Sequence, residues 1–90
     1  MAKRFVVNQT NNITGYVGKV TNRYIDNFGP WTDKSRAYEY LVKCVNDCIK
    51  FMMRKGYDYQ IKTYNNEHVK IVDRNNKWNY FELVLLDLSY

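Results

Sequence analysis

The strongest pattern of hydrophobic and polar positions lies in the middle of the chain, where apolar residues recur at helical period. Successive members are 4, 3, 1, 3, 1 and 3 residues apart: Ala37, Leu41, Cys44, Val45, Cys48, Ile49 and Met52. This spacing puts them on one face of a helix, which the sequence predicts from about 33 to 55. Thr32, Asp33 and Ser35 can each supply an N-cap oxygen. Gly56 suits the left-handed position that often ends a helix.

Before this helix, short runs rich in β-branched and aromatic residues predict strands. The first run is Arg4–Gln9, the second is Ile13–Val20, and a short third is Arg23–Asp26. Asn27–Pro30 then has the composition of a loop, which leads to Trp31 at the start of the helix.

After the helix, the pattern changes to the alternation of a three-strand meander. The predicted strands are Tyr57–Tyr64, His68–Asp73 and Trp78–Leu88, and Asn-rich turns separate them. The order β-β-(β)-α-β-β-β is typical of an α+β fold, with one long helix (about 33–55) packed on an antiparallel sheet. Ninety residues form a single domain, 1–90.

The last predicted strand is apolar on both of its faces. Tyr80, Val84 and Leu86 alternate with Phe81 and its neighbours Leu83 and Leu85. A strand of this kind is usually central or covered by a partner. We therefore expect the face away from the helix to be covered, either by the N-terminal strands or by a second copy of the chain.

The charge balance points toward anionic partners. The formal net charge is +5, and ten basic but only four acidic side chains lie in residues 1–57. A basic surface of this kind attracts nucleic acid or an acidic protein. However, Asn, Lys, Tyr, Ile and Phe make up 38 of the 90 residues, and all five are encoded by AT-rich codons. A coding bias would raise the Lys and Tyr content without any function.

The sequence offers no catalytic or metal-binding pattern, so we expect no enzyme, no cofactor and no metal site. Cys44 and Cys48 lie on one helix face, and with the single His68 they do not make the four ligands of a structural zinc site. Two small buried thiols are the simpler interpretation, and free thiols point to a reducing compartment. Without a membrane-length apolar run or a signal-peptide pattern in MAKRFVVNQ, a cytoplasmic location is expected.

A first candidate surface has the residue types of a nucleic-acid-binding surface. Its basic residues recur at steps of 7, 7 and 4 on the helix face opposite the apolar stripe: Arg36, Lys43, Lys50 and Arg54. Strand tyrosines, including Tyr16 and Tyr24, could stack on bases. The alternative is an ordinary solvated helix face, since Glu39 and Asp47 flank Lys43 at four-residue spacing.

A second candidate surface has the residue types of a protein-binding surface. In Asn27–Thr32, Phe28 and Trp31 flank a rigid Gly-Pro pair, which would preorganise a projecting aromatic anchor. The alternative is that Trp31 packs under the start of the helix and covers the core.

The chain contains the succession RYID, GPWT and DKSRAYEYL, in which Trp31-Thr32 is followed by Ala37. With this succession, residues 4–42 resemble small phage-encoded accessory proteins. The resemblance implies a host-takeover or anti-defence protein, such as an anti-CRISPR inhibitor, that acts in the host cytoplasm. Such a protein occupies the surface of a host protein or of a protein–nucleic-acid complex. A chain at +5 departs from the acidic DNA mimics of that class, so direct contact is expected rather than mimicry. A nucleic-acid-binding module is the alternative function, and a homodimer is a further expected assembly.

Overall fold

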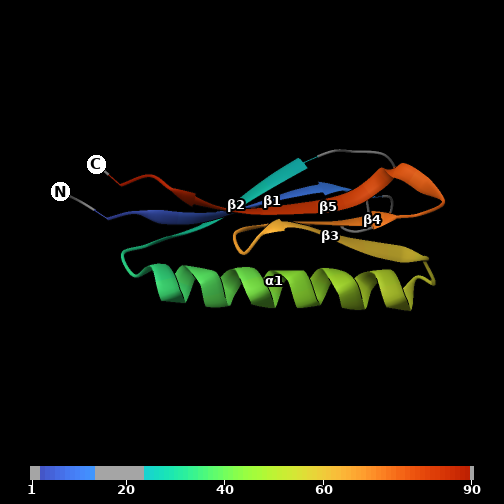
Figure 1. Cartoon of the computed structure of the whole chain (residues 1–90), viewed down its shortest axis with the longest axis horizontal. Coiled ribbons are helices and arrows are strands. Elements are labelled where there is room, and N and C mark those ends of the chain that lie inside the picture. Colours follow the sequence, from blue (N-terminus) through green and yellow to red (C-terminus); the bar gives the residue numbers. More distant parts are fainter. Residues whose placement is uncertain (1–2, 14–23, 90) are drawn as a thin grey trace.

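One helix lies along one face of a five-stranded antiparallel sheet, which confirms the predicted α+β class (Figure 1). The computed structural model describes residues 3–13 and 24–89. The elements, in chain order, are β1 (Phe5–Asn12), β2 (Tyr24–Trp31), α1 (Lys34–Arg54), β3 (Tyr59–Asn65), β4 (His68–Asp73) and β5 (Asn76–Asp87). The strands lie in the order β2-β1-β5-β4-β3, so β2 and β3 are the two edges of the sheet that residues 3–13 and 24–89 form.

Both ends of α1 are capped by residues that the sequence indicated as candidates. Asp33 is the N-cap, and its Oδ1 accepts hydrogen bonds from the backbone N–H of Ser35 at 3.0 Å and from its hydroxyl at 2.8 Å. These bonds favour the carboxylate and lower the pKa of Asp33. At the other end Gly56 has φ 73°, and the N–H of Tyr57 donates to the carbonyl of Met52 at 3.0 Å. This left-handed stop turns the chain directly toward β3.

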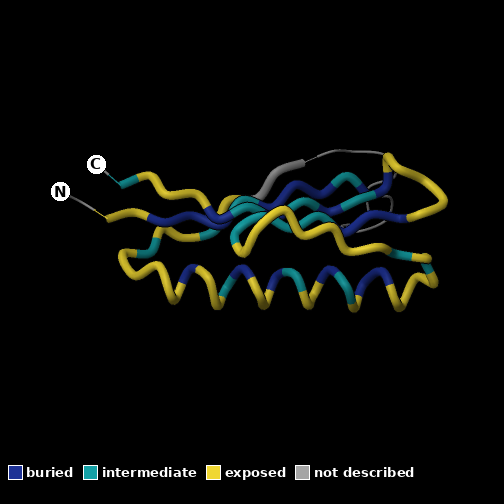
Figure 2. The backbone as a smooth tube through the Cα atoms, viewed as in Figure 1, coloured by how far each residue is buried: buried dark blue, intermediate teal, exposed yellow. Residues whose placement is uncertain are grey.

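The core lies between α1 and the middle of the sheet. Figure 2 shows that α1 is buried only on the side that faces the sheet. The buried residues of α1 are Ala37, Leu41, Cys44, Cys48, Phe51 and Met52. They face the buried positions of β1, β4 and β5, and the rings of Phe51 and Phe81 meet edge to face with centroids 5.8 Å apart. The predicted stripe is thus confirmed as core, except that Val45 and Ile49 are only half-buried.

The two described N-terminal strands, β1 and β2, do not cover the other face of the sheet, contrary to one of the expected arrangements. β1 and β2 lie beside β5 in the plane of the sheet rather than over it. On this outer face Tyr80 and Val84 are half-buried and Leu86 is exposed. The Lys70 ammonium lies 4.3 Å from the centroid of the Tyr80 ring, so a neighbouring side chain covers part of that ring. Cover by a second copy stays a prediction.

The predicted loop Asn27–Pro30 is wrong, because these residues belong to β2. Phe28 pairs with Val7 and Asn27 with Asn8. Gly29, at φ 112°, provides a conformation that other residues avoid, and an edge strand tolerates Pro30 because no partner needs its missing N–H. The predicted strand Ile13–Val20 continues into residues 14–23, outside the described part of the chain. No helix in 3–13 or 24–89 has the length and apolar character needed to cross a membrane.

Candidate functional site

The basic residues predicted from the sequence form one exposed flank of α1. Arg36, Lys43, Lys50 and Arg54 are all exposed, and we call this set the basic flank. It lies on the side of β2, because Tyr40, which is next to it on α1, contacts aromatic rings of that strand. The structure therefore brings these four cations to one side of the helix.

Phe28 and Trp31 support the helix instead of projecting from the molecule. Both are half-buried and pack against the core. Their ring centroids lie 5.2 Å and 5.1 Å from that of Tyr40, and the Lys43 ammonium lies 5.3 Å from the same ring. This arrangement matches the alternative in which Trp31 covers the core under the start of α1.

Two shallow hollows follow the basic flank. The first, of about 470 Å³, is lined by Trp31, Arg36, Glu39, Tyr40 and Lys43. The second, of about 510 Å³, is lined by Asp47, Lys50, Phe51, Met53 and Arg54. Each hollow contains a carboxylate among its cations, which weakens its attraction for a phosphate. The first hollow nevertheless joins three residues of the predicted site.

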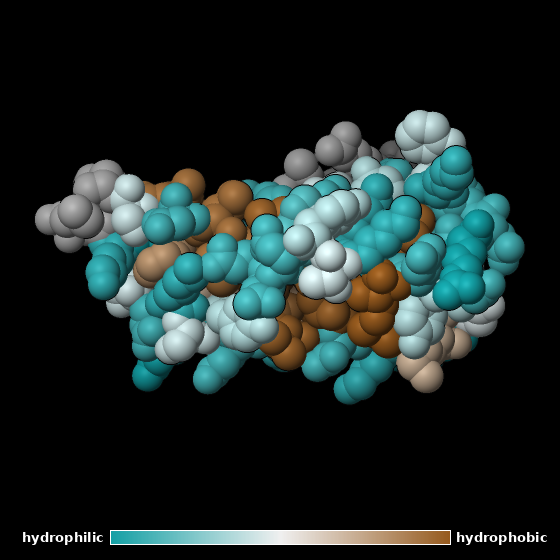
Figure 3. Space-filling view, viewed as in Figure 1, coloured by the Kyte–Doolittle hydropathy of each residue, from teal (hydrophilic) through white to brown (hydrophobic). Residues whose placement is uncertain are grey.

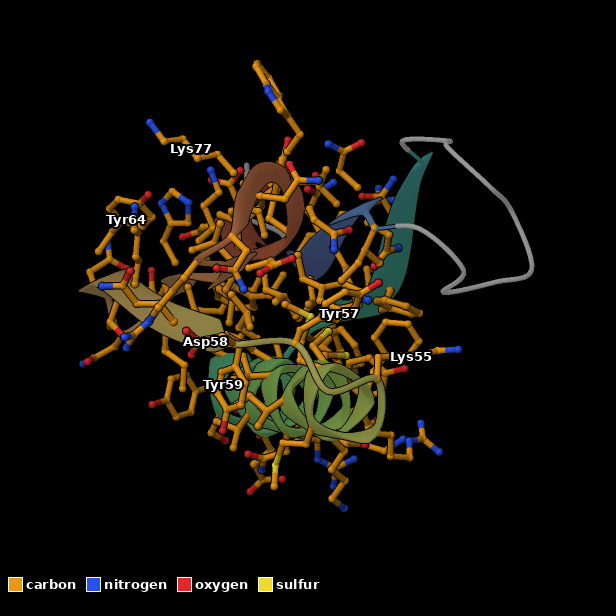
Figure 4. The ribbon with its side chains drawn as sticks, turned by 90° about the vertical axis from the view of Figure 1, so that its right-hand side faces the viewer. Lys55, Tyr57, Asp58, Tyr59, Tyr64 and Lys77 are labelled. Atoms are coloured by element: carbon orange, nitrogen blue, oxygen red, sulfur yellow. The ribbon has the colours of Figure 1, made fainter. Side chains whose placement is uncertain are left out.

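The predicted tyrosines do not extend this basic flank. Tyr16 lies outside the described residues, as does the side chain of Tyr24 at the start of β2. Two other tyrosines lie on β3, at the opposite edge of the sheet from β2. There Tyr59 points to the helix side and Tyr64 to the outer face (Figure 4). A continuous surface of basic and aromatic side chains, as single-stranded nucleic acid prefers, is therefore not assembled by the described residues.

The opposite flank of α1, which faces β3, is apolar. Its helix residues are 4, 3, 4 and 4 apart: Tyr38, Val42, Val45, Ile49 and Met53. Together with Tyr59 and Ile61 of β3 they form what we call the apolar flank. Met53, the last of the helix residues, lies between the two flanks, because it also lines the second hollow with Lys50 and Arg54. Met53 is 61% exposed, Ile61 46%, and Tyr38 and Val42 41% each. Figure 3 shows apolar side chains gathered between β3 and α1.

Contacts at both ends fix β3 relative to this flank. The Lys34 ammonium of α1 lies 2.6 Å from the Glu67 carboxylate in the β3–β4 turn, and this contact raises the pKa of Lys34. At the other end the hydrogen bond from the N–H of Tyr57 to the carbonyl of Met52 holds the chain, two residues before β3, against the C-terminus of the helix. This surface was not predicted from the sequence, because the helical period placed Val45 and Ile49 in the core. The second apolar stripe, at the same helical period, was the available signal.

The outer face of the sheet carries a polar network around His68. Its Nε2 lies 2.6 Å from the Glu82 carboxylate, and its ring lies 4.4 Å from that of Tyr64, centroid to centroid. Cys44 and Cys48 lie on α1, on the other side of the sheet, and burial raises the pKa of the Cys48 thiol. This thiol is therefore kept protonated and unreactive. The described residues contain no group of three metal-ligating side chains.

Trp78 is the most exposed of the large apolar side chains described, at 80%, and the sequence analysis placed it only in a strand. It lies near the start of β5, next to Lys77, which projects away from α1 (Figure 4). A tryptophan that contributes so little to the core is a candidate anchor for a partner.

Comparison with known proteins adds no relative, since no protein-family model, curated protein or solved structure matches the chain.

Proposed function

We propose that the chain is a small non-enzymatic binding protein that acts by occupying the surface of another protein, and that its contact surface is the apolar flank. The observation that carries the proposal is the exposure of Tyr38, Val42 and Met53 along one flank of α1, together with Ile61 on the neighbouring strand β3. Single exposed apolar residues are ordinary, whereas a contiguous strip with polar residues around it is typical of an interface.

The proposal extends to the kind of partner. In line with the resemblance over residues 4–42, the partner is a host protein or a protein–nucleic-acid complex. The chain is then a phage-type, anti-CRISPR-like inhibitor that works in the host cytoplasm. A net charge of +5 and an exposed apolar strip both favour direct blocking of the partner's surface over mimicry of acidic DNA.

Photo-cross-linking tests which surface meets the partner. A benzoylphenylalanine replaces Tyr38 on the apolar flank in one variant and Lys50 on the basic flank in the control; both positions are exposed. The chain is produced in bacterial cells, irradiated and purified under denaturing conditions after nuclease treatment. We expect discrete protein adducts from position 38 and none above background from position 50. Adducts from position 50 alone, or adducts lost on nuclease treatment, would overturn the proposal.

Nucleic-acid binding is the second candidate, favoured by the gathering of Arg36, Lys43, Lys50 and Arg54 on one flank. If all four contact phosphates, the log–log slope of affinity against salt should be about −3.6 on duplex DNA, since each contact releases counterions. We expect instead no gel shift on duplex or single-stranded probes at micromolar protein and low salt. A shift with that slope, abolished by the double variant Lys43→Glu and Lys50→Glu, would establish the second candidate.

A further inference from the structure

The edge strand β3 has an unpaired side. It pairs with β4 along one edge, and no described strand pairs with the other. The N–H and C=O groups of every second residue point away from β4 on that side, because backbone groups alternate in an antiparallel pair. Gln60 to Asn65 are all exposed, as Figure 2 shows along the strand. The strand thus offers a row of free backbone donors and acceptors.

β3 lacks most of the features that protect an edge from pairing. The other edge, β2, contains Pro30 and, at Gly29, a φ of 112°, and both interrupt a regular ladder. β3 contains neither proline nor glycine, and Lys62 is its one charged residue. Its register with β4 is regular from Tyr59 to Thr63. An added strand would therefore find at least five residues of uniform ladder.

The apolar flank lies on the helix side of this edge. Neighbouring strands are about 4.8 Å apart, and β3 begins beside the C-terminus of α1 (Figure 1). A strand added along Tyr59–Thr63 would therefore lie beside the C-terminal half of α1, which carries Ile49 and Met53. Its alternate side chains would point down onto these residues and Ile61. Burying the exposed parts of these side chains would remove apolar surface from water and favour binding. Backbone pairing and apolar contact would then act together, as in other cases of strand addition.

The charges on the opposite face indicate the chemistry of the added strand. Lys62 lies directly opposite Lys70 across the β3–β4 ladder, and like charges in this position repel. Glu82 stands opposite Lys70 on β5 but is in contact with His68. Lys62 forms no ion pair with the residues that the structure describes. An acidic side chain on an added strand would lie next to Lys62 and relieve this repulsion.

We propose that β3 binds an extended segment of a partner protein as a sixth strand, with apolar side chains on its helix side alternating with acidic ones on its outer side. The inference rests on the proposed function and names the mode and chemistry of the contact. A second copy of the chain is the less suitable occupant. Pairing β3 with itself would bring together two Lys62–Lys70 pairs on chains of net charge +5.

Backbone-modified peptides test the strand addition directly. The probe is a capped octapeptide of alternating Val and Glu with a fluorescent label, titrated with the full chain by anisotropy. Two further probes carry N-methyl groups, one on every Val and the other on every Glu. In an added strand only one of these two sets faces β3. We expect that set alone to weaken binding by at least tenfold, about the effect of 1.4 kcal/mol.

Charge variants test the predicted chemistry. Lys62→Glu should lower the affinity for the Val/Glu peptide about tenfold and raise the affinity for a peptide of alternating Val and Lys. The matched control is Lys77→Glu, which makes the same charge change near the start of β5 and should alter neither affinity. Both lysines are exposed, so unchanged thermal unfolding would show that both variants remain folded.

Three results would overturn the inference. In the first, the Val/Glu peptide does not bind at millimolar concentration. In the second, both methylation patterns change the peptide affinity equally. In the third, sedimentation shows a dimer that Ile61→Lys dissociates. If cross-linked adducts form at position 38 but both methylation patterns have an equal effect on peptide affinity, the apolar flank binds a folded surface of the partner. The proposed function would then stand without strand addition. Absence of both adducts and peptide binding would refute the two proposals together.

Discussion

Replacing Leu41 by Ala is expected to lower the free energy of unfolding by about 2–5 kcal/mol. Leu41 is among the largest fully buried side chains and lies in the middle of the helix face that meets the sheet. Its removal would leave a cavity between α1 and the central strands, which the rigid sheet can fill only in part. For a domain of this size, a loss of even 2 kcal/mol is a large share of the total stability.

Urea unfolding followed by circular dichroism measures this loss. Val42→Ala is the matched control: it is the next residue on α1 but is 41% exposed, so its cost should stay below about 1 kcal/mol. A loss below about 1 kcal/mol for Leu41→Ala, with the fold intact, would mean that α1 presents a different face to the sheet.

Gly29→Ala is expected to lower the free energy of unfolding by about 2–4 kcal/mol. Its φ of 112° is rarely adopted by residues with a side chain. A Cβ there would also lie 2.8 Å from Cε3 of Trp31 and 3.0 Å from the carbonyl oxygen of Phe5. Relief of these contacts would have to move Trp31 away from Tyr40 or separate β2 from β1.

Gly56→Ala separates the two causes of this loss. Gly56 also has a positive φ, 73°, but nothing lies within 4 Å of the Cβ that would be added. Its replacement should therefore cost only the backbone strain, about 1–2 kcal/mol. Thermal and urea unfolding of the two variants side by side make the comparison. Equal losses would show that the ring of Trp31 moves aside without cost.

The helix and its core face were predictable because several independent signals agreed. The apolar period, the N-cap candidates Thr32, Asp33 and Ser35, and a left-handed stop at Gly56 all indicated the same segment. Local signals are reliable when they coincide. The hairpin strands after the helix were predictable for a similar reason, since short Asn-rich turns separate alternating runs.

The path of β2 was not predictable, because its composition favours a turn. Asn27 to Pro30 have the residue types of a loop, and only the pairing of Asn27 and Phe28 with β1 makes them a strand. Pairing partners distant in sequence leave no local trace. The contact between His68 and Glu82 was missed for the same reason, since it joins two strands.

In the candidate site, the exposure of the four basic residues of α1 was predictable, whereas the half-buried packing of Phe28 and Trp31 was not. The basic residues of α1 were expected on one face, and they are. Whether Trp31 projects or packs depends on Tyr40, whose position follows from the placement of β2. The apolar flank depends on how far β3 extends over the helix, and helical period alone does not determine this.

The central position of β1 and β5 has a consequence for how the chain folds. Phe5 pairs with Asp87 and Asn12 with Tyr80, so the two strands come from distant parts of the sequence. The helix and the β3–β4–β5 meander can form from near neighbours, whereas the pairing of β1 with β5 must close a long loop, which slows folding. During synthesis, Phe5 and Val7 leave the ribosome long before β5 exists. Until then their side chains have no sheet partner to cover them, and a chaperone that shields apolar segments would assist this chain most over that interval.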